Sequence, residues 1–209
     1  MKIYVVGSSK NKFLPLDNIR EKFLIDQPHE GDNIDFLNPW YCELTGLYYL
    51  WKHVDDDIVG LEHYRRYFVN DENQLLNEKE IRRILKNNDI IVFYDKSYIP
   101  MKGGWFLKPK NNQIKLSKIA ANAYVNINEK LGTILKNYLI TPGCYMFNMF
   151  ICKKEIFNII CKQLFEILST EPIIEDLKRS HGYISEMILG ALFQYNNLKI
   201  YNAKFKMEK

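Results

Sequence analysis

The 209-residue chain has no long hydrophobic run that would place it in a membrane. No stretch comes near the ~18 apolar residues that a membrane-spanning helix needs. The first apolar run, Ile3 to Val6, is only four residues long and is followed by Gly7 and polar residues, so it does not resemble a secretory signal peptide. We therefore expect a cytoplasmic protein, and peripheral contact with the inner face of the cytoplasmic membrane stays open.

Cysteine is scarce as well, and its spacing argues against a structural zinc site. None of the four cysteines belongs to a C-x-x-C pair, and none has a histidine at zinc-finger spacing. Each lies in an apolar stretch, which is typical of a small buried side chain in a reducing compartment. These residues are Cys42, Cys144, Cys152 and Cys161.

Several motifs and a strong charge bias are also missing. The absence of G-x-G-x-x-G and of G-x-x-x-x-G-K-[ST] argues against a dinucleotide oxidoreductase and a P-loop ATPase. No G-x-S-x-G nucleophile elbow is present. The net charge is only +4, and the basic residues are scattered, whereas a nucleic-acid-binding protein usually shows a clustered basic excess. We therefore expect no nucleic-acid partner.

The composition is that of an ordinary globular chain, with 47% hydrophobic and 26% charged residues, and the length suits one domain. Aromatic residues reach 14%. That richness suits stacking on sugars and bases, but a core rich in Tyr and Phe is the simpler explanation.

Apolar runs and helical periodicity alternate along the first hundred residues, and this β–α–β–α–β order predicts a parallel sheet covered by helices. Asn38 is expected to cap the first helix, with Pro39 at its first position. Asn77 and Glu80 form a capping-box pattern before the second helix. The expected strands are 3–6, 57–61, 90–94, 146–152 and 198–201, and the expected helices are 38–53, 79–87, 154–168 and 182–194. Residues 101–112 read as a loop, and 115–138 as weakly helical.

In open parallel sheets, ligands bind outside the carboxyl ends of the strands. This rule places Gly7–Lys10, Glu62–Arg66 and Tyr94–Lys96 at one edge. The middle segment contains Arg65 and Arg66. Each guanidinium group is planar and permanently charged, so it can bind two phosphate oxygens and would neutralise the charge of a leaving diphosphate. If the strand continued through them, His63 and Arg65 would point to one face, and Tyr64 and Arg66 to the other.

Acidic residues leave further alternatives open. Asp55–Asp57 resemble a metal site, but they precede a strand, so a solvated turn is the simpler reading. They are also close enough in sequence to form salt bridges with the two arginines, which would then have no ligand role. Glu186 lies early in a helix. Its carboxylate either stabilises the helix by lying near the positive end of the helix dipole or takes part in catalysis. His53 is expected to complement the other end of its own helix dipole.

Six segments of the chain carry a resemblance to a known family. The first four read G-D-N-I, N-P-W-Y-C-E-L-T-G-L-Y, W-K and G-L-E-H-Y-R-R-Y-F, at residues 31–34, 38–48, 51–52 and 60–68. Later, N-M-F-I-C-K-K-E occupies 148–155, and G-Y-I-S-E follows Arg179 at 182–186. In this order the segments resemble a family of bacterial capsular and exopolysaccharide biosynthesis proteins that was long catalogued as a domain of unknown function.

The resemblance implies a nucleotide-sugar-dependent glycosyltransferase with a GT-A-like α/β fold, a mainly parallel central sheet flanked by helices. Its expected donor is a UDP-linked sugar, and its expected acceptor is an oligosaccharide or a lipid-linked glycan in capsule, exopolysaccharide or lipopolysaccharide synthesis. The chain would be one domain, with about 1–97 binding the nucleotide-sugar and about 98–209 facing the acceptor. Met187 stands where the family pattern has Arg. No Asp-x-Asp motif stands near Glu62–Tyr64, where the fold would place one, so a requirement for Mn²⁺ or Mg²⁺ stays open.

Candidate site residues follow from the edge rule and the resemblance together. Glu186 is the candidate base that deprotonates the acceptor hydroxyl, and His63 would orient a phosphate, a sugar or a metal. The donor-binding candidates are Gly7, Asp32, Asn33, Asn38, Glu43, Arg65 and Arg66. The acceptor-side candidates are Asn148, Arg179 and Tyr183. The alternative from another class is a non-catalytic module that binds a glycan or a nucleotide.

Overall fold

The computed structural model describes residues 1–97, 129–173 and 175–207. The strands are β1 (Lys2–Gly7), β2 (Arg20–Leu24), β3 (Ile58–His63), β4 (Arg66–Val69), β5 (Ile90–Asp95), β6 (Cys144–Lys153), β7 (Ile200–Asn202) and β8 (Lys204–Met207). The helices are the 3-10 turn η1 (Asp35–Leu37), α1 (Asn38–Tyr41), α2 (Glu43–His53), α3 (Glu78–Ile84), α6 (Glu129–Ile140), α7 (Lys154–Leu168) and α8 (Ser180–Tyr195).

The strands form one mixed sheet with the order β2-β1-β3-β6-β5-β7. β1 runs parallel to β2 and β3, and β5 runs parallel to β7. β6 is antiparallel to both β3 and β5, so β5 points in the same direction as β3. Five of these six strands therefore run one way, and the predicted mainly parallel sheet is confirmed. β4 and β8 extend the sheet beside β3 in antiparallel fashion.

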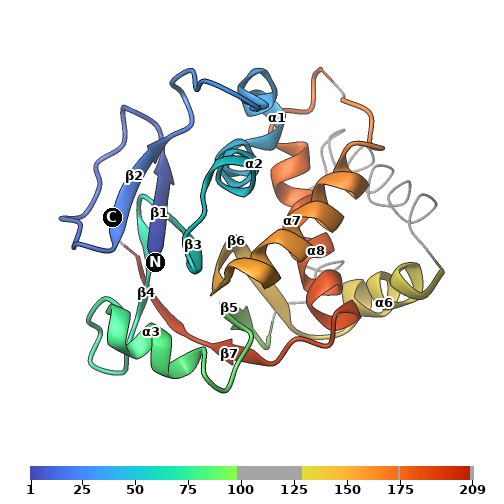
Figure 1. Ribbon diagram of the computed structural model, residues 1–209. Coiled ribbons are helices and arrows are strands. Elements are labelled where there is room, and N and C mark those ends of the chain that lie inside the picture. The colour runs from blue at the N-terminus through green and yellow to red at the C-terminus, as the bar shows by residue number, and fades with distance from the viewer. Residues whose placement is uncertain (98–128, 174, 208–209) are drawn as a thin grey trace.

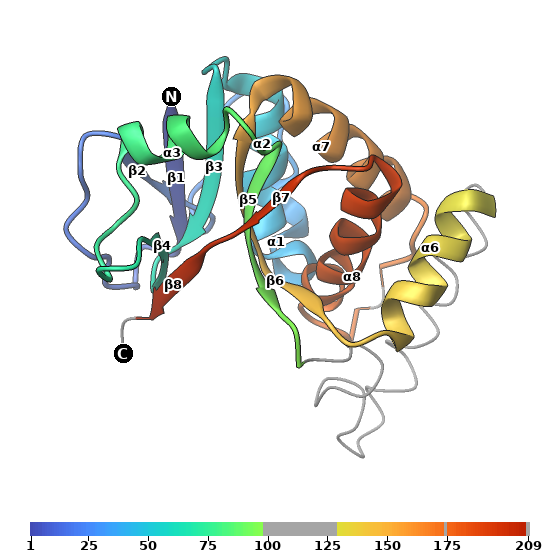
Figure 2. The same cartoon turned by 90° about the horizontal axis from the view of Figure 1, so that it is seen from below.

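Helices cover both faces of this sheet, as Figures 1 and 2 show. Alternate residues of β3 face opposite layers because successive side chains of a strand point to opposite sides. Val59 and Leu61 pack into the larger core, together with α2, α7 and α8. Ile58 packs into the smaller core, together with Ile81 and Ile84 of α3. The sheet is thus buried on both faces, and its strand ends are the part that remains available for a ligand.

Two predicted local signals are confirmed. Asn77 Oδ1 accepts a hydrogen bond from Glu80 N at 3.0 Å, and Glu80 Oε2 accepts one from Asn77 N at 2.9 Å, which completes the capping box of α3. α7 spans the predicted residues 154–168 and buries Ile160 and Leu164 along one side.

Other predictions were wrong for identifiable reasons. Asn38 does not cap a long helix, because its side-chain amide donates to Ile25 O at 2.8 Å. The helix is instead divided at Cys42, whose φ of 51° ends α1 before α2 begins. Strands β2, β4 and β8 were not predicted. β2 shows why, because this edge strand carries exposed Glu21 and Lys22 and has no apolar alternation.

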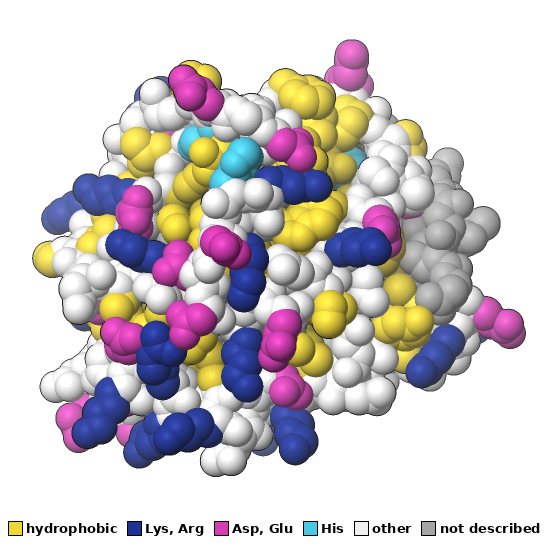
Figure 3. Space-filling view, in the orientation of Figure 1, with side chains coloured by type: hydrophobic (Ala, Val, Ile, Leu, Met, Phe, Trp, Pro, Cys, Tyr) yellow, Lys and Arg dark blue, Asp and Glu magenta, His cyan; other side chains and the backbone are white. Residues whose placement is uncertain are grey.

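The predicted loop 101–112 lies outside the described residues, as does most of the weakly helical stretch 115–138, of which α6 is the described part. Among the described residues, no helix is both long and apolar enough to cross a membrane. On the face seen in Figure 3, Lys and Arg side chains lie intermixed with Asp and Glu side chains.

Candidate functional site

The carboxyl ends of β1, β3 and β5 lie at one edge of the sheet, as the sequence predicted, and the start of the reversed strand β6 joins them. Gly7 ends β1 beside the turn that follows β3. A Cβ atom at Gly7 would lie only 2.9 Å from Cβ of Tyr64, so the close approach of the two segments requires glycine there. The Tyr64 N–H donates to Val6 O at 2.9 Å.

The segment after β3 folds as a tight hairpin, which corrects the predicted alternation of its side chains. His63 of β3 and Arg66 of β4 are cross-strand partners, and Tyr64 and Arg65 form the turn between them. His63 and Arg66 therefore share one face, with Arg66 Nη1 3.4 Å from His63 Nδ1. The Arg66 guanidinium lies 4.3 Å from the centre of the Phe147 ring, whereas Arg65 is exposed.

The acidic turn before β3 does not pair with these arginines. Asp57 binds Arg82 at 2.6 Å, and the amino group of Met1 lies 3.0 Å from both Asp56 and Asp57. The structure describes both segments in full and contains no ion pair between them. Arg65 and Arg66 are therefore not held by the alternative salt bridges.

Asn148 reaches the site through an irregularity in β6. Val92 pairs with Phe150 and Tyr94 with Tyr145, so two steps along β5 correspond to five along β6, and three residues of β6 bulge out. Phe147 and Asn148 in this bulge have positive φ values of 75° and 53°. Bulges of this kind re-aim side chains and are frequent beside active sites.

The Asn148 amide connects three elements of the site. Its Nδ2 donates to Glu43 Oε1 at 2.7 Å and to Gly182 O at 2.9 Å, while its Oδ1 accepts from Ser185 Oγ at 2.9 Å. The side chain is 3% exposed. The first residue of α2 and the second turn of α8 are thereby fixed relative to β6.

Two carboxyl groups converge at this point. Glu186 of α8 is only 7% exposed, and burial, followed by the charge of Glu43, raises its pKa well above the ordinary value. Burial also raises the pKa of Glu43, against the hydrogen bond from Asn148. A raised carboxyl pKa close to a basic cluster is typical of catalytic sites.

The basic side of the site contains His63, Arg66 and Arg179. Burial and the charge of Arg66 lower the pKa of His63 to about 3, so this ring is neutral near pH 7. Its Nε2 has no hydrogen bond of good geometry in the part of the chain that the structure describes. Burial and the nearby Arg65 lower the pKa of Arg66. The pKa of Arg179 is raised. Burial acts to lower it, but nearby groups outweigh burial, first among them Tyr183, whose ring centre lies 5.4 Å from the guanidinium.

Backbone strain is concentrated in this site. Of the six described non-glycine residues with positive φ, four belong to it: Cys42, Phe147, Asn148 and Arg179. Each such residue costs on the order of 1–3 kcal/mol, and strain of this kind tends to gather where function requires it.

In the described part of the chain, the side chains of three predicted donor residues form hydrogen bonds with residues outside this cluster. Asp32 accepts a hydrogen bond from Tyr48 Oη at 2.9 Å. Asn33 Nδ2 donates to His29 O at 2.8 Å, within its own loop. Asn38 binds the backbone of Ile25. Their role in donor binding stays a prediction, whereas Glu43, His63, Arg66, Asn148, Arg179, Tyr183 and Glu186 lie together.

The sequence analysis did not identify Ser185 as a site residue, and it did not predict the buried ion pair that Glu62 forms with Arg20. Ser185 had no signal of its own beyond its place in G-Y-I-S-E. Glu62 is fully buried and forms a bidentate pair with Arg20, at 2.8 and 3.1 Å, and it also accepts from Phe68 N at 3.0 Å. The carboxylate at the expected metal position is therefore already bonded, and the described residues contain no group of three His, Cys, Asp or Glu that suits a metal.

The eight described strands and their covering helices thus form an α/β fold with polar groups gathered at the strand ends. The solved structure of a WbbM bifunctional glycosyltransferase, in its apo form, has the same fold, with a TM-score of 0.76 and 24% identity. The likeness covers 99% of this chain but 45% of that chain, so this chain spans less than half the length of the WbbM chain.

Residues 2–197 match the family described as Domain of unknown function (DUF4422), and the chain belongs to that family. A search of curated proteins gave no match. The predicted GT-A-like α/β fold is thus confirmed.

Proposed function

We propose that the chain transfers a sugar from a nucleotide diphosphate sugar, with UDP as the expected nucleotide, to a hydroxyl of a glycan acceptor. The observation that carries the proposal is the convergence of a buried acid, Glu186, with Arg66 and Arg179 at the carboxyl edge of a glycosyltransferase-type sheet. The motifs that hold these residues support a role in capsule, exopolysaccharide or lipopolysaccharide assembly in the cytoplasm. The acceptor is an oligosaccharide or a lipid-linked glycan.

The arrangement supports a nucleotide at the end of β1. Phe13 and Tyr64 meet edge to face at 6.3 Å beside Gly7, and Lys22 Nζ lies 5.1 Å from the Phe13 ring. Aromatic faces near cationic groups suit the stacking of a base. The turn of Tyr64 and Arg65 leads from the Phe13 and Tyr64 rings to Arg66. A base bound beside these rings would therefore direct its diphosphate toward Arg65 and Arg66.

The chemistry then follows from the charges. In a direct displacement, Glu186 takes the proton of the acceptor hydroxyl while the hydroxyl oxygen bonds to the anomeric carbon. The bond from that carbon to the diphosphate oxygen breaks, and its electron pair leaves with the nucleoside diphosphate. Arg65 and Arg66 neutralise this developing charge. Because burial raises the pKa of Glu186, the group acts as a base only in its deprotonated form, and in that form it is a stronger base than an exposed glutamate.

The described residues do not by themselves form a cation site, since Glu62 is engaged by Arg20. Mn²⁺ or Mg²⁺ therefore stays a prediction, and no step is assigned to it.

Binding and turnover of candidate donors test the proposal. A nucleoside diphosphate at a hundred times its dissociation constant should add about 2.7 kcal/mol of stability. For a chain of this size, that corresponds to an increase in melting temperature of about 5–11 °C. Melting is measured with UDP and GDP, each with Mn²⁺ and with EDTA, and release of UDP from UDP-sugars is followed in parallel. Binding with release supports a transferase. Binding without release under any condition would indicate the non-catalytic module, and no binding would overturn the donor site.

A further inference from the structure

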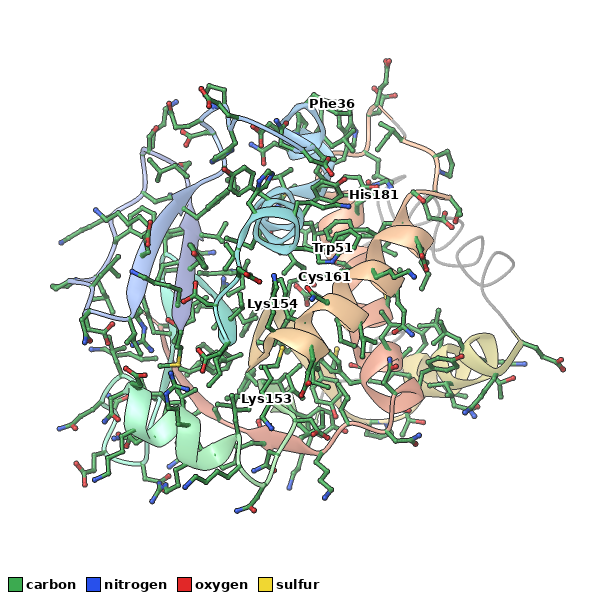
Figure 4. All side chains as sticks on the ribbon, in the orientation of Figure 1. Phe36, Trp51, Lys153, Lys154, Cys161 and His181 are labelled. Carbon is green, nitrogen blue, oxygen red and sulfur yellow. The ribbon has the colours of Figure 1, made fainter. Side chains whose placement is uncertain are left out.

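The helix start that carries Arg179 and the helix end that leads into Glu43 are joined by one buried aromatic contact. His181 is fully buried and stacks on Tyr41, which is 5% exposed, with ring centroids 4.5 Å apart and ring planes at 14°. His181, labelled in Figure 4, lies inside the helical layer where α8 begins. Because no solvent reaches its side chain, it does not contact a substrate that binds at the strand ends.

The two rings are themselves held in place. Tyr41 Oη donates to Leu168 O at 3.2 Å, and His181 Nδ1 lies 3.1 Å from Ser180 Oγ. Burial lowers the pKa of His181 to about 4, so the imidazole is neutral near pH 7 and stacks without charge. The contact is thus a rigid apolar stack at neutral pH.

The backbones on either side of the stack are in direct contact. The Arg179 N–H donates to Pro39 O at 2.9 Å. A Cβ atom at Gly182 would lie 3.6 Å from Tyr41 O and 3.7 Å from Cβ of Cys42, so little space separates α1 from α8. We call the residues Tyr41, Cys42, Arg179, His181 and Gly182 the α1–α8 junction.

Each side of the junction continues directly into the candidate site. Glu43 follows Cys42, and Arg179 stands two residues before His181. Cys42 and Arg179 have φ values of 51° and 64°, which persist only where surrounding contacts enforce them. The Gly182 carbonyl, next to His181, accepts a hydrogen bond from Asn148 Nδ2 and lies 2.8 Å from Ser185 Oγ.

We propose that His181 is a positioning residue, which holds Glu43 and Arg179 in the geometry of the candidate site through its stack on Tyr41. The inference rests on the proposed function only where it concerns sugar transfer, since the geometry of the junction is measurable by itself. His181 acts through Arg179 and Glu43 and not on the reacting atoms.

Cys42 provides the readout that does not depend on activity. It is the partly accessible one of the four cysteines, while the other three are buried. In His181→Ala, the loosened junction should speed the reaction of the Cys42 thiol with a maleimide by more than about tenfold, because local opening becomes less costly. His181→Phe keeps a flat ring on Tyr41 and should restore the slow labelling of the original protein.

Sugar transfer provides the second readout. A small displacement of positioned groups costs on the order of 10²-fold in rate, so His181→Ala should lower the transfer rate by about this factor. If His181 acts through Arg179, its effect should shrink in a protein that already lacks Arg179. Adding His181→Ala to the Arg179→Ala variant should lower the transfer rate of that variant by no more than about threefold, because the two effects are coupled. His181→Phe should recover most of the transfer rate.

A matched control separates positioning from general loss of stability. Phe165 of α7 is also buried and stacks on Trp51, with centroids 5.8 Å apart and planes at 6°, and neither residue belongs to the junction. Phe165→Ala should lower the melting temperature without changing Cys42 labelling. Equal labelling in His181→Ala and Phe165→Ala would overturn the positioning role, and additive rate losses with Arg179→Ala would overturn its action through Arg179. If the original protein transfers no sugar at all, the proposed function fails, while the labelling result still decides the role of His181.

Discussion

Replacing Asn148 with alanine tests whether its amide holds the candidate site together. The substitution removes the hydrogen bond to the Glu43 carboxyl group, which contributes about 1.5–3 kcal/mol to stability. It also removes the two neutral hydrogen bonds to Gly182 and Ser185, which contribute about 0.5–1.5 kcal/mol each. Alanine also tolerates the φ of 53° less well than asparagine. Because the three bonds share one amide and are not additive, we expect a loss of about 3–5 kcal/mol in the free energy of unfolding.

Denaturant titration and thermal melting measure this loss. At about 2–4 °C per kcal/mol for a chain of this length, the melting temperature should fall by roughly 6–20 °C. Asn158→Ala, on the exposed side of α7, is the matched control and should change stability by no more than about 0.5 kcal/mol. A loss below about 1 kcal/mol in Asn148→Ala would refute the reasoning, because a buried amide with three partners cannot be removed so cheaply.

Three further predictions concern charged groups. Arg65→Lys and Arg66→Lys should each weaken donor binding in calorimetric titration with little change in melting temperature, because lysine keeps the charge but loses the planar fork; unchanged affinity in both would remove this motif from the donor site. Glu62→Gln should cost about 1.5–3 kcal/mol in stability, because it removes one of the two carboxylates that pair with the buried Arg20 and leaves only Asp17, and a neutral result would show that the pair with Glu62 is not structural. The raised pKa of Glu186 means that the folded protein keeps a proton that the unfolded chain releases above about pH 4.5, so stability falls as pH rises. Glu186→Gln should therefore gain in melting temperature over the original protein between pH 5 and pH 8, whereas parallel curves would contradict the raised pKa.

The parts of the fold that the sequence predicted correctly are those encoded locally. The apolar spacing of Ile160 and Leu164 is enough to predict α7, and the Asn77–Glu80 pattern is enough to predict the start of α3. The edge at which β1, β3 and β5 end follows from strand order and direction. The two helix features depend on residues that are close in the sequence, and the shared edge depends only on the alternating order of strands and helices.

The features that were missed depend on partners that are distant in the sequence. Arg20 lies in a polar edge strand, and nothing near it indicates that it pairs with Glu62. The bulge that aims Asn148 at Glu43 arises from a register shift between β5 and β6, which periodicity within β6 does not reveal. The hairpin at Tyr64 and Arg65 interrupts a segment without glycine or proline, so the reversal that places His63 beside Arg66 had no local signal.

Sugar transfer by Glu186→Gln tests the central claim most directly. The amide keeps the size of the side chain but cannot take a proton from the acceptor, so the transfer rate should fall by about 10²–10⁴-fold. Nucleotide affinity should stay close to that of the original protein. Glu155→Gln, an exposed acid in the first turn of α7, is the control and should transfer sugar at the normal rate. Transfer from a UDP-sugar that collapses only in Glu186→Gln is the result we predict, and transfer at an unchanged rate in that variant would contradict the account.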